Sequence, residues 1–219
     1  MARERGRDIL PEIEGLVDLI FGLALSIGAL ILINTVPKTS EEILSDILAF
    51  TYGFIILVFI WEEVTKEMLL FKVETTRMLR VTYLLLFLVA LEPYLFNLIT
   101  QHTSSGGVDE ISSMLYAADL GALMVILAFF AQRIIDGEGN LSPRVRKIYL
   151  EKRGQFVFTA AVFVISMIPI FWELSIWGTK LRFILWILAP LVGVVVGVYR
   201  RHREKVQENE AASGQPRVN

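Results

Sequence analysis

The sequence contains no cysteine and only two histidines, His102 and His202, among its 219 residues. Disulfides, thiolate nucleophiles and cysteine-ligated metals are therefore excluded, and a histidine-rich metal site cannot be built. Basic and acidic residues nearly balance, at 21 and 23, so there is no dominant basic surface for a nucleic-acid partner. Motifs of zinc and serine hydrolases, P-loop enzymes and dinucleotide-binding enzymes are also absent. We expect neither an enzyme nor a resident cofactor or metal.

Long apolar runs are the main feature that is present. Hydrophobic residues make up 54% of the chain, above the share usual in soluble domains, and the mean hydropathy is positive. A membrane span needs about 20 mostly apolar residues, and runs of that length with no period-2 alternation argue against strands. The sequence therefore predicts an all-α, polytopic membrane protein with six transmembrane helices, over residues 15–36, 43–61, 81–100, 112–135, 154–172 and 181–199.

The connecting segments predict where helices extend and where the fold ends. Residues 62–80 are charged but keep apolar residues at helical spacing, so the second and third helices are expected to continue beyond the membrane. Ser142 followed by Pro143 is typical of a helix start, with the serine as N-cap. We expect one membrane domain over residues 1–199 and a disordered cytoplasmic tail over residues 200–219.

Lysine and arginine are distributed unequally between the two predicted sides of the membrane. The N-terminus, the second and fourth loops and the C-terminal tail together carry 18 of them, whereas the opposite side carries 3. By the positive-inside rule, both termini are expected to be cytoplasmic, which agrees with an even number of spans.

Three carboxylates lie deep within the predicted spans: Asp18, Glu92 and Asp119. Ionisable residues inside a span are costly and are candidates for function, although interfacial positions or pairing with arginines explain them equally well. By residue type alone, Asp18 and Asp119 could form the aspartyl pair of a membrane hydrolase, but neither lies in a motif that would position it for hydrolysis.

The first predicted helix carries a regular stripe of side chains. At 100° per residue, one face holds the residues that we call the helix-one stripe: Leu19, Leu23, Ser26, Ile27, Leu30 and Asn34. Small residues on other faces, such as Gly22 and Ala29, would let neighbouring helices approach closely. Spacing alone favours lipid contact or core packing for the stripe.

Several stretches resemble one known family. Residues 18–27, DLIFGLALSI, resemble the first helix of the transmembrane protein 175 family of potassium channels, which has R-x-x-x-F-S-D before an apolar run. Residues 52–71, aromatic-rich up to Trp61, and residues 83–94, YLLLFLVALEPY, resemble its second and third helices. Residues 116–118 resemble the start of its fourth helix. The resemblance covers residues 12–130, and the last two helices agree only in number and orientation.

The chain also departs from the family pattern. The family's helix-one Arg, Phe and Ser are replaced by Glu12, Leu16 and Val17, so only Asp18 remains of that motif. The histidine after the second-helix tryptophan is absent, and Thr82 stands where the family has asparagine. These polar groups are expected to tie helices one to three together in the family. This chain resembles a distant member that must hold the junction differently, through Asp18, Trp61 and Thr82.

The resemblance implies a cation channel, assembled as a homotetramer with the first helices lining a central pore. The helix-one stripe would then face the axis, with Leu23, Ile27 and Leu30 as apolar gating rings and Ser26 as a hydroxyl ring for a transient potassium ion. Asn34 would lie near the outer mouth, while Asp18, off the stripe by about 130°, belongs to the helix junction. The implied partners are a second copy of the chain, the lipid bilayer and potassium or other monovalent cations, in a prokaryotic cell membrane.

Two other functions stay open at this point. A proton-coupled transporter would use Glu92 and Asp119 as a relay, with flux that saturates and depends on pH. A non-conducting membrane scaffold would keep the fold and form an oligomer without flux.

Overall fold

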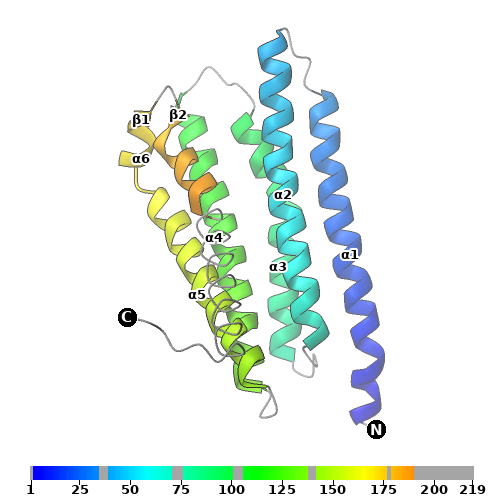
Figure 1. The fold of residues 1–219 in the computed structure, drawn as a ribbon. Coiled ribbons are helices and arrows are strands. Elements are labelled where there is room, and N and C mark those ends of the chain that lie inside the picture. The colour runs from blue at the N-terminus through cyan, green and yellow to red at the C-terminus, as the bar shows by residue number, and fades with distance from the viewer. Residues whose placement is uncertain are drawn as a thin grey trace, which may run out of the picture. The chain divides into compact units, whose positions relative to one another are not determined.

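The computed structural model describes residues 2–34, 39–70, 76–100, 106–137, 142–176 and 179–189, which are almost entirely helical (Figure 1). The helices are α1 (Ala2–Asn34), α2 (Ser40–Leu70), α3 (Thr76–Thr100), α4 (Gly106–Gly137), α5 (Pro143–Ser166) and the short α6 (Ile170–Glu173). Residues 181–189 are also helical. The strands β1 (Ser175–Ile176) and β2 (Thr179–Lys180) form an antiparallel hairpin. The hairpin lies in the connection between the fifth and sixth predicted spans, so it does not contradict the expectation that the long apolar runs are not strands.

The chain divides into two compact units, Met1–Ile168 and Pro169–Asn219. In the second unit, Trp172 packs edge-on against Phe183, and Phe183 packs edge-on against Trp186, with ring centroids 6.1 and 5.1 Å apart. The predicted sixth span, residues 181–199, is described only as far as Ala189. The predicted tail, residues 200–219, lies outside the described residues.

Among the described residues, four helices are long and apolar enough to cross a membrane, over Glu12–Ile31, Ser40–Leu70, Arg77–Thr100 and Glu110–Gly137. These match the first four predicted spans, and the chain is a multi-pass membrane protein. Helix α5 is not among them, because its first half is charged and it ends at Ser166, shortly before Pro169. A span count of six and the sidedness of the termini stay predictions.

Two local predictions are confirmed. Helix α5 begins as expected, with the Ser142 hydroxyl accepting a hydrogen bond from the Val145 N–H at 3.4 Å and proline in the first turn. Helices α2 and α3 extend past the apolar runs, to Leu70 and from Thr76. Helix α3 also continues through Pro93 to Thr100, so the Glu92–Pro93 pair does not end it.

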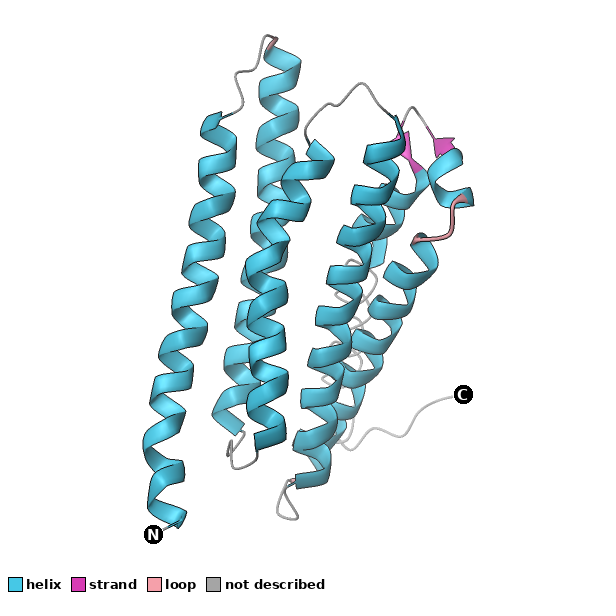
Figure 2. Cartoon of the chain, turned by 180° about the vertical axis from the view of Figure 1, so that it is seen from behind, coloured by secondary structure: helices cyan, strands magenta, loops and turns pink. Residues whose placement is uncertain are grey.

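Helix α4 lies at the centre of the first unit, and α1 lies at its edge (Figure 2). Helix α4 packs against α3 and α5, whereas α1 packs against α2 and α3. In the most apolar 18-residue stretch of each helix, 67% of the stretch is buried in α4 but only 22% in α1. Helix α1 therefore keeps one long face uncovered by the rest of its own subunit.

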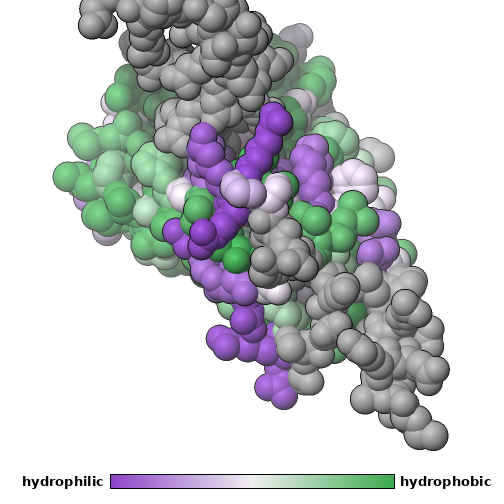
Figure 3. Space-filling view, turned by 60° about the horizontal axis from the view of Figure 1, so that its bottom comes forward, coloured by the Kyte–Doolittle hydropathy of each residue, from purple (hydrophilic) through white to green (hydrophobic). Residues whose placement is uncertain are grey.

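Polar side chains gather at the end of the first unit where α2 and α4 end and α3 and α5 begin (Figure 3). The guanidinium groups of Arg77 and Arg133, from α3 and α4, both lie 5.7 Å from the centroid of the Phe129 ring. Lys152 of α5 meets Glu63 of α2 at the same end. Basic residues of the second and fourth predicted loops thus lie at the same end of the first unit.

Candidate functional site

Helix α1 has one buried face and one exposed face. The side chains that recur every third or fourth position on its packed face are 4% exposed or less: Ile13, Val17, Phe21 and Ala24. Apolar residues of the helix-one stripe are exposed on the other side, including Leu19 at 66% and Leu23 at 52%. The 3.6-residue helical period separates these two sets, so the stripe is free to contact lipid or other subunits.

The structure places the predicted pore-lining residues as follows. Leu23, Ser26, Ile27 and Leu30 are all exposed on one side of α1. The Ser26 hydroxyl donates to the Gly22 carbonyl oxygen at 2.7 Å. This bond uses the hydroxyl proton and leaves the oxygen lone pairs able to face a cation. Asn34 is the last residue of α1, and its side chain lies outside the described residues.

Two of the three predicted junction residues meet. The Trp61 indole N–H donates to Asp18 Oδ1 at 2.9 Å and joins α2 to α1. Thr82 is buried in α3, where its hydroxyl donates to the Met78 carbonyl oxygen at 3.1 Å within the same helix.

The Trp61→Phe variant is expected to lower the free energy of unfolding by about 1 kcal/mol, because it keeps an aromatic ring but loses the bond to Asp18. Reversible denaturation in mixed micelles measures this change. The Asp18→Asn variant keeps a hydrogen-bond acceptor at the same position, so its free energy of unfolding is expected to fall by less. Equal stability of Trp61→Phe and the parent protein would show that this bond does not hold α1 against α2.

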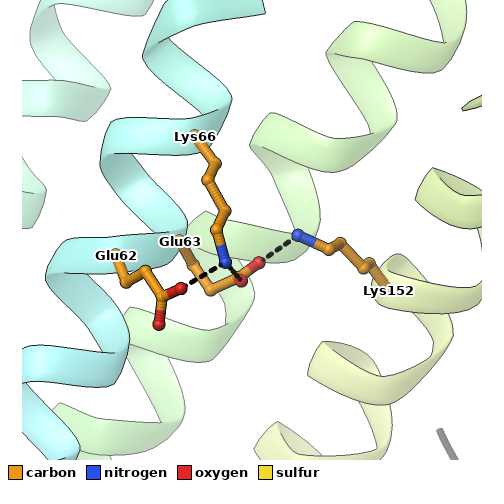
Figure 4. Close-up of polar contacts among 4 residues, drawn as sticks. All are labelled: Glu62, Glu63, Lys66 and Lys152. Carbon is orange, nitrogen blue, oxygen red and sulfur yellow. Dashed lines mark hydrogen bonds and ion pairs between the residues drawn. The ribbon is translucent and has the colours of Figure 1, made fainter.

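A group of charged residues joins α2 to α5 (Figure 4). Glu63, with 8% of its side chain exposed, accepts from Lys152 of α5 at 2.5 Å and from Lys66 at 3.2 Å. Lys66 also lies 2.7 Å from Glu62, where both side chains are about half exposed. One turn further along α2, Glu67 is fully buried, and neither of its oxygens has a hydrogen-bond partner within the described ranges.

Tyr149 of α5 borders this group. Burial, together with the nearby carboxylates of Glu67 and Glu63, raises the pKa of Tyr149 to about 12. Its hydroxyl therefore stays neutral at physiological pH and adds no negative charge.

The sequence placed Glu62 and Glu63 at the end of the second helix but did not single out Glu67 or Lys152. The i,i+4 spacing of Glu63 and Glu67, each next to an apolar residue (Val64 and Met68), could have indicated that the two glutamates share one buried face of the helix.

A second buried polar cluster lies between α2, α3 and α4. The Tyr116 hydroxyl donates to Glu92 Oε1 at 3.0 Å, and Glu92 is 2% exposed. Both oxygens of Asp119 and the hydroxyl of Tyr52 are buried without a hydrogen-bond partner among the residues that the structure describes. The helices thus bring Glu92 and Asp119 into one cluster but leave Asp18 outside it, bonded to Trp61. In the described part of the chain, no three His, Asp or Glu side chains could together hold a metal ion.

No protein-family model and no curated protein matches the chain. Among solved structures, a variant of the potassium channel MtTMEM175, in complex with a nanobody–MBP fusion protein, matches with a TM-score of 0.61. The match covers 87% of this chain and 93% of that chain, at 15% sequence identity. The chain has a TMEM175-like fold. The likeness supports, at the level of the fold, the resemblance seen in the sequence, and it extends beyond residues 12–130, for which that resemblance was stated.

Within the TMEM175-like fold, the residues available for function fall into three places. They are the helix-one stripe on the uncovered face of α1, the Glu92 cluster in the core, and the Glu63 group at the polar end. The helix-one stripe is exposed along most of α1 and combines apolar side chains with the Ser26 hydroxyl, which is able to contact an ion. The outer face of α2 has a similar composition, with Ile47, Thr51 and Ile55 exposed.

Proposed function

We propose that the chain is a distant member of the TMEM175 family and conducts potassium or other monovalent cations as a homotetramer. Helix α1 of each subunit lines a central pore. The observation that carries this proposal is the exposure of the helix-one stripe on the edge helix of a channel-like fold, with Leu23 at 52% and Leu30 at 57%. We further propose six spans, cytoplasmic termini and a place in a prokaryotic cell membrane.

In a symmetric tetramer, the helix-one stripe would line the pore as a series of rings. Around a rotation axis, each stripe residue forms a ring, because every subunit presents the same position to the centre. Rings of Leu23, Ile27 and Leu30 form apolar constrictions that resist wetting, which is the physical basis of a hydrophobic gate. The ring of Ser26 oxygens lies among them and offers a transient contact to a partly dehydrated potassium ion.

The test is flux from potassium-loaded liposomes that contain the purified protein, with sodium and N-methylglucamine as comparison ions. Potassium flux above sodium flux, with no N-methylglucamine flux, supports the proposal. Light scattering of the purified protein should give a tetramer, because a monomer cannot form a central pore from one helix per subunit. The absence of flux from a correctly assembled oligomer would favour the scaffold function instead.

The Ser26→Ala variant is expected to change the ratio of potassium to sodium flux by about fivefold, since an ion contact of about 1 kcal/mol is lost from the ring. Reversal potentials in planar bilayers measure the ratio. Thr51→Val is the matched control, because the Thr51 hydroxyl makes the same kind of bond, to Ile47 O at 2.8 Å, but lies on α2. An unchanged ratio in Ser26→Ala would remove this residue from the pore.

A proton-coupled transporter is the second candidate. The observation that favours it is the buried polar cluster, in which Asp119 has two unpartnered oxygens within the described residues and Glu92 bonds to Tyr116. Intramembrane carboxylates of this kind are typical of proton relays. Such a protein would show flux that saturates with substrate, depends on pH and is abolished by Asp119→Asn, whereas channel flux would survive that change.

A further inference from the structure

A cavity lies between α1, α2 and α3, with about 530 Å³ of empty space that includes its open side. Helix α1 contributes Leu25 and Gly28 to its wall. At 100° per residue these positions point roughly away from Leu23 of the helix-one stripe. A molecule in this cavity would therefore sit behind α1, outside the proposed conduction path.

The wall of the cavity is apolar and aromatic, but it contains two carboxyl groups. Phe50, Phe54 and Phe96 supply ring surfaces, and Asp46 and Glu92 supply the carboxyls. None of the described lining residues is basic. The cavity is therefore complementary to a molecule with an apolar body and a positive charge, since aromatic faces and carboxylates both attract cations.

Glu92 is the carboxyl placed to receive that charge. Its Oε1 lies 3.6 Å from the position that a Cβ atom would take on Gly53 of α2. Because Gly53 has no side chain, α2 places no side-chain atoms between its backbone and this oxygen. The Tyr116 hydroxyl of α4 donates to the same oxygen at 3.0 Å.

Two further polar side chains lie near Glu92 but do not line the cavity. Asp119, within electrostatic reach of Glu92, is 4% exposed, and both its oxygens lack a hydrogen-bond partner within the described residues. The Tyr52 ring lies 6.5 Å from that of Phe96, and the Tyr52 hydroxyl is likewise without a partner there. An ammonium group in the cavity therefore meets Glu92 and Asp46 as its charged partners.

We propose that this cavity binds a hydrophobic primary amine. The ammonium group donates to the Glu92 carboxylate beside Gly53, and the apolar body packs against Phe50, Phe54 and Phe96. Occupation of this site does not depend on ion conduction, so binding can be measured whether or not the pore is open.

The probe is 4-(4-fluorophenyl)butylamine, followed by fluorine NMR with the protein in nanodiscs, and empty nanodiscs correct for partition into lipid. The matched neutral probe is the corresponding butanol, which has the same shape without the charge. The amine is expected to bind at least about tenfold more tightly than the alcohol, since a hydrogen bond to a charged group contributes that much.

The Glu92→Gln variant is expected to weaken amine binding by about 10- to 100-fold and to leave the alcohol unchanged, because only the charge is lost. Glutamine keeps the shape of the side chain and the bond from Tyr116. Asp46→Asn is expected to have a smaller effect. Equal binding of amine and alcohol, unchanged amine binding in Glu92→Gln, or a loss confined to Asp46→Asn would each overturn the proposal.

A second variant keeps the test decisive if Glu92→Gln does not fold. In Gly53→Ala the added methyl group makes ordinary contacts, 3.6 Å from Glu92 and 3.7 Å from Phe96, but it takes up space in the cavity wall beside the carboxyl group. Amine binding is expected to weaken by roughly fivefold or more, because the methyl group occupies part of the space that the ammonium group needs. Gly154→Ala on α5, where nothing lies within 4 Å, is the matched control and should bind normally. Full amine binding by Gly53→Ala would contradict the placement of the ammonium.

Discussion

Replacing Ile27 by alanine is expected to raise potassium flux through the reconstituted protein by about tenfold, equivalent to a barrier lower by about 1.4 kcal/mol. Ile27 is 36% exposed in the subunit and occupies the middle of the helix-one stripe. In the proposed tetramer its side chains form a narrow apolar ring, and removing them widens the ring and eases wetting. Leu23→Ala should act in the same direction. Potassium flux from liposomes under equal ion gradients measures the change.

The control for this prediction is Ile55→Ala, which makes the same chemical change at a residue of α2 that is 60% exposed. It lies outside the proposed pore lining, so its flux should equal that of the parent protein. If Leu23→Ala and Ile27→Ala leave flux unchanged and Ser26→Ala leaves selectivity unchanged, α1 does not line the pore, although the fold would stand.

The second large effect is expected for Lys152→Met, which should lower the free energy of unfolding by about 3 kcal/mol. Lys152 is the partner of Glu63 from another helix, at 2.5 Å, and the Glu63 side chain is only 8% exposed. Removing the lysine leaves a buried carboxylate with Lys66, which is 3.2 Å away and 46% exposed, to compensate its charge. Denaturation in mixed micelles measures the loss.

A double-mutant cycle separates the ion pair from other effects of the Lys152 substitution. Once Glu63→Gln has removed the charge, adding Lys152→Met should cost much less than it does in the parent protein. Lys66→Met is the matched control, because 46% of the Lys66 side chain is exposed and a solvated ion pair contributes little. Additive costs of Glu63→Gln and Lys152→Met would show that the pair does not hold α2 against α5.

Some features followed from local sequence because their causes are local. Apolar runs longer than any strand predicted the first four spans, and Ser142–Pro143 predicted the start of α5. The continuation of α2 to Leu70 was also predicted, whereas the start of α1 at Ala2, well before its apolar run, was not. A helix in a membrane protein ends where its backbone hydrogen bonding ends, whereas hydropathy reports only the part that lipid can cover. The β1–β2 hairpin was not predicted either, because strands of two residues are too short to show an alternating pattern of apolar and polar residues.

The sequence by itself determined the class of protein, the positions of its apolar helices and the existence of the helix-one stripe. It also named Asp18, Trp61, Glu92 and Asp119 as polar residues that such helices must accommodate. Only the tertiary structure decided which side of α1 stays uncovered, that Trp61 donates to Asp18, and that Gly53 and Glu92 line one cavity. It also revealed Glu63 and Lys152 as an ion pair between residues 89 positions apart in the chain. The physical reason is that helical periodicity fixes which residues share a face, whereas the neighbour of each face depends on how distant helices pack.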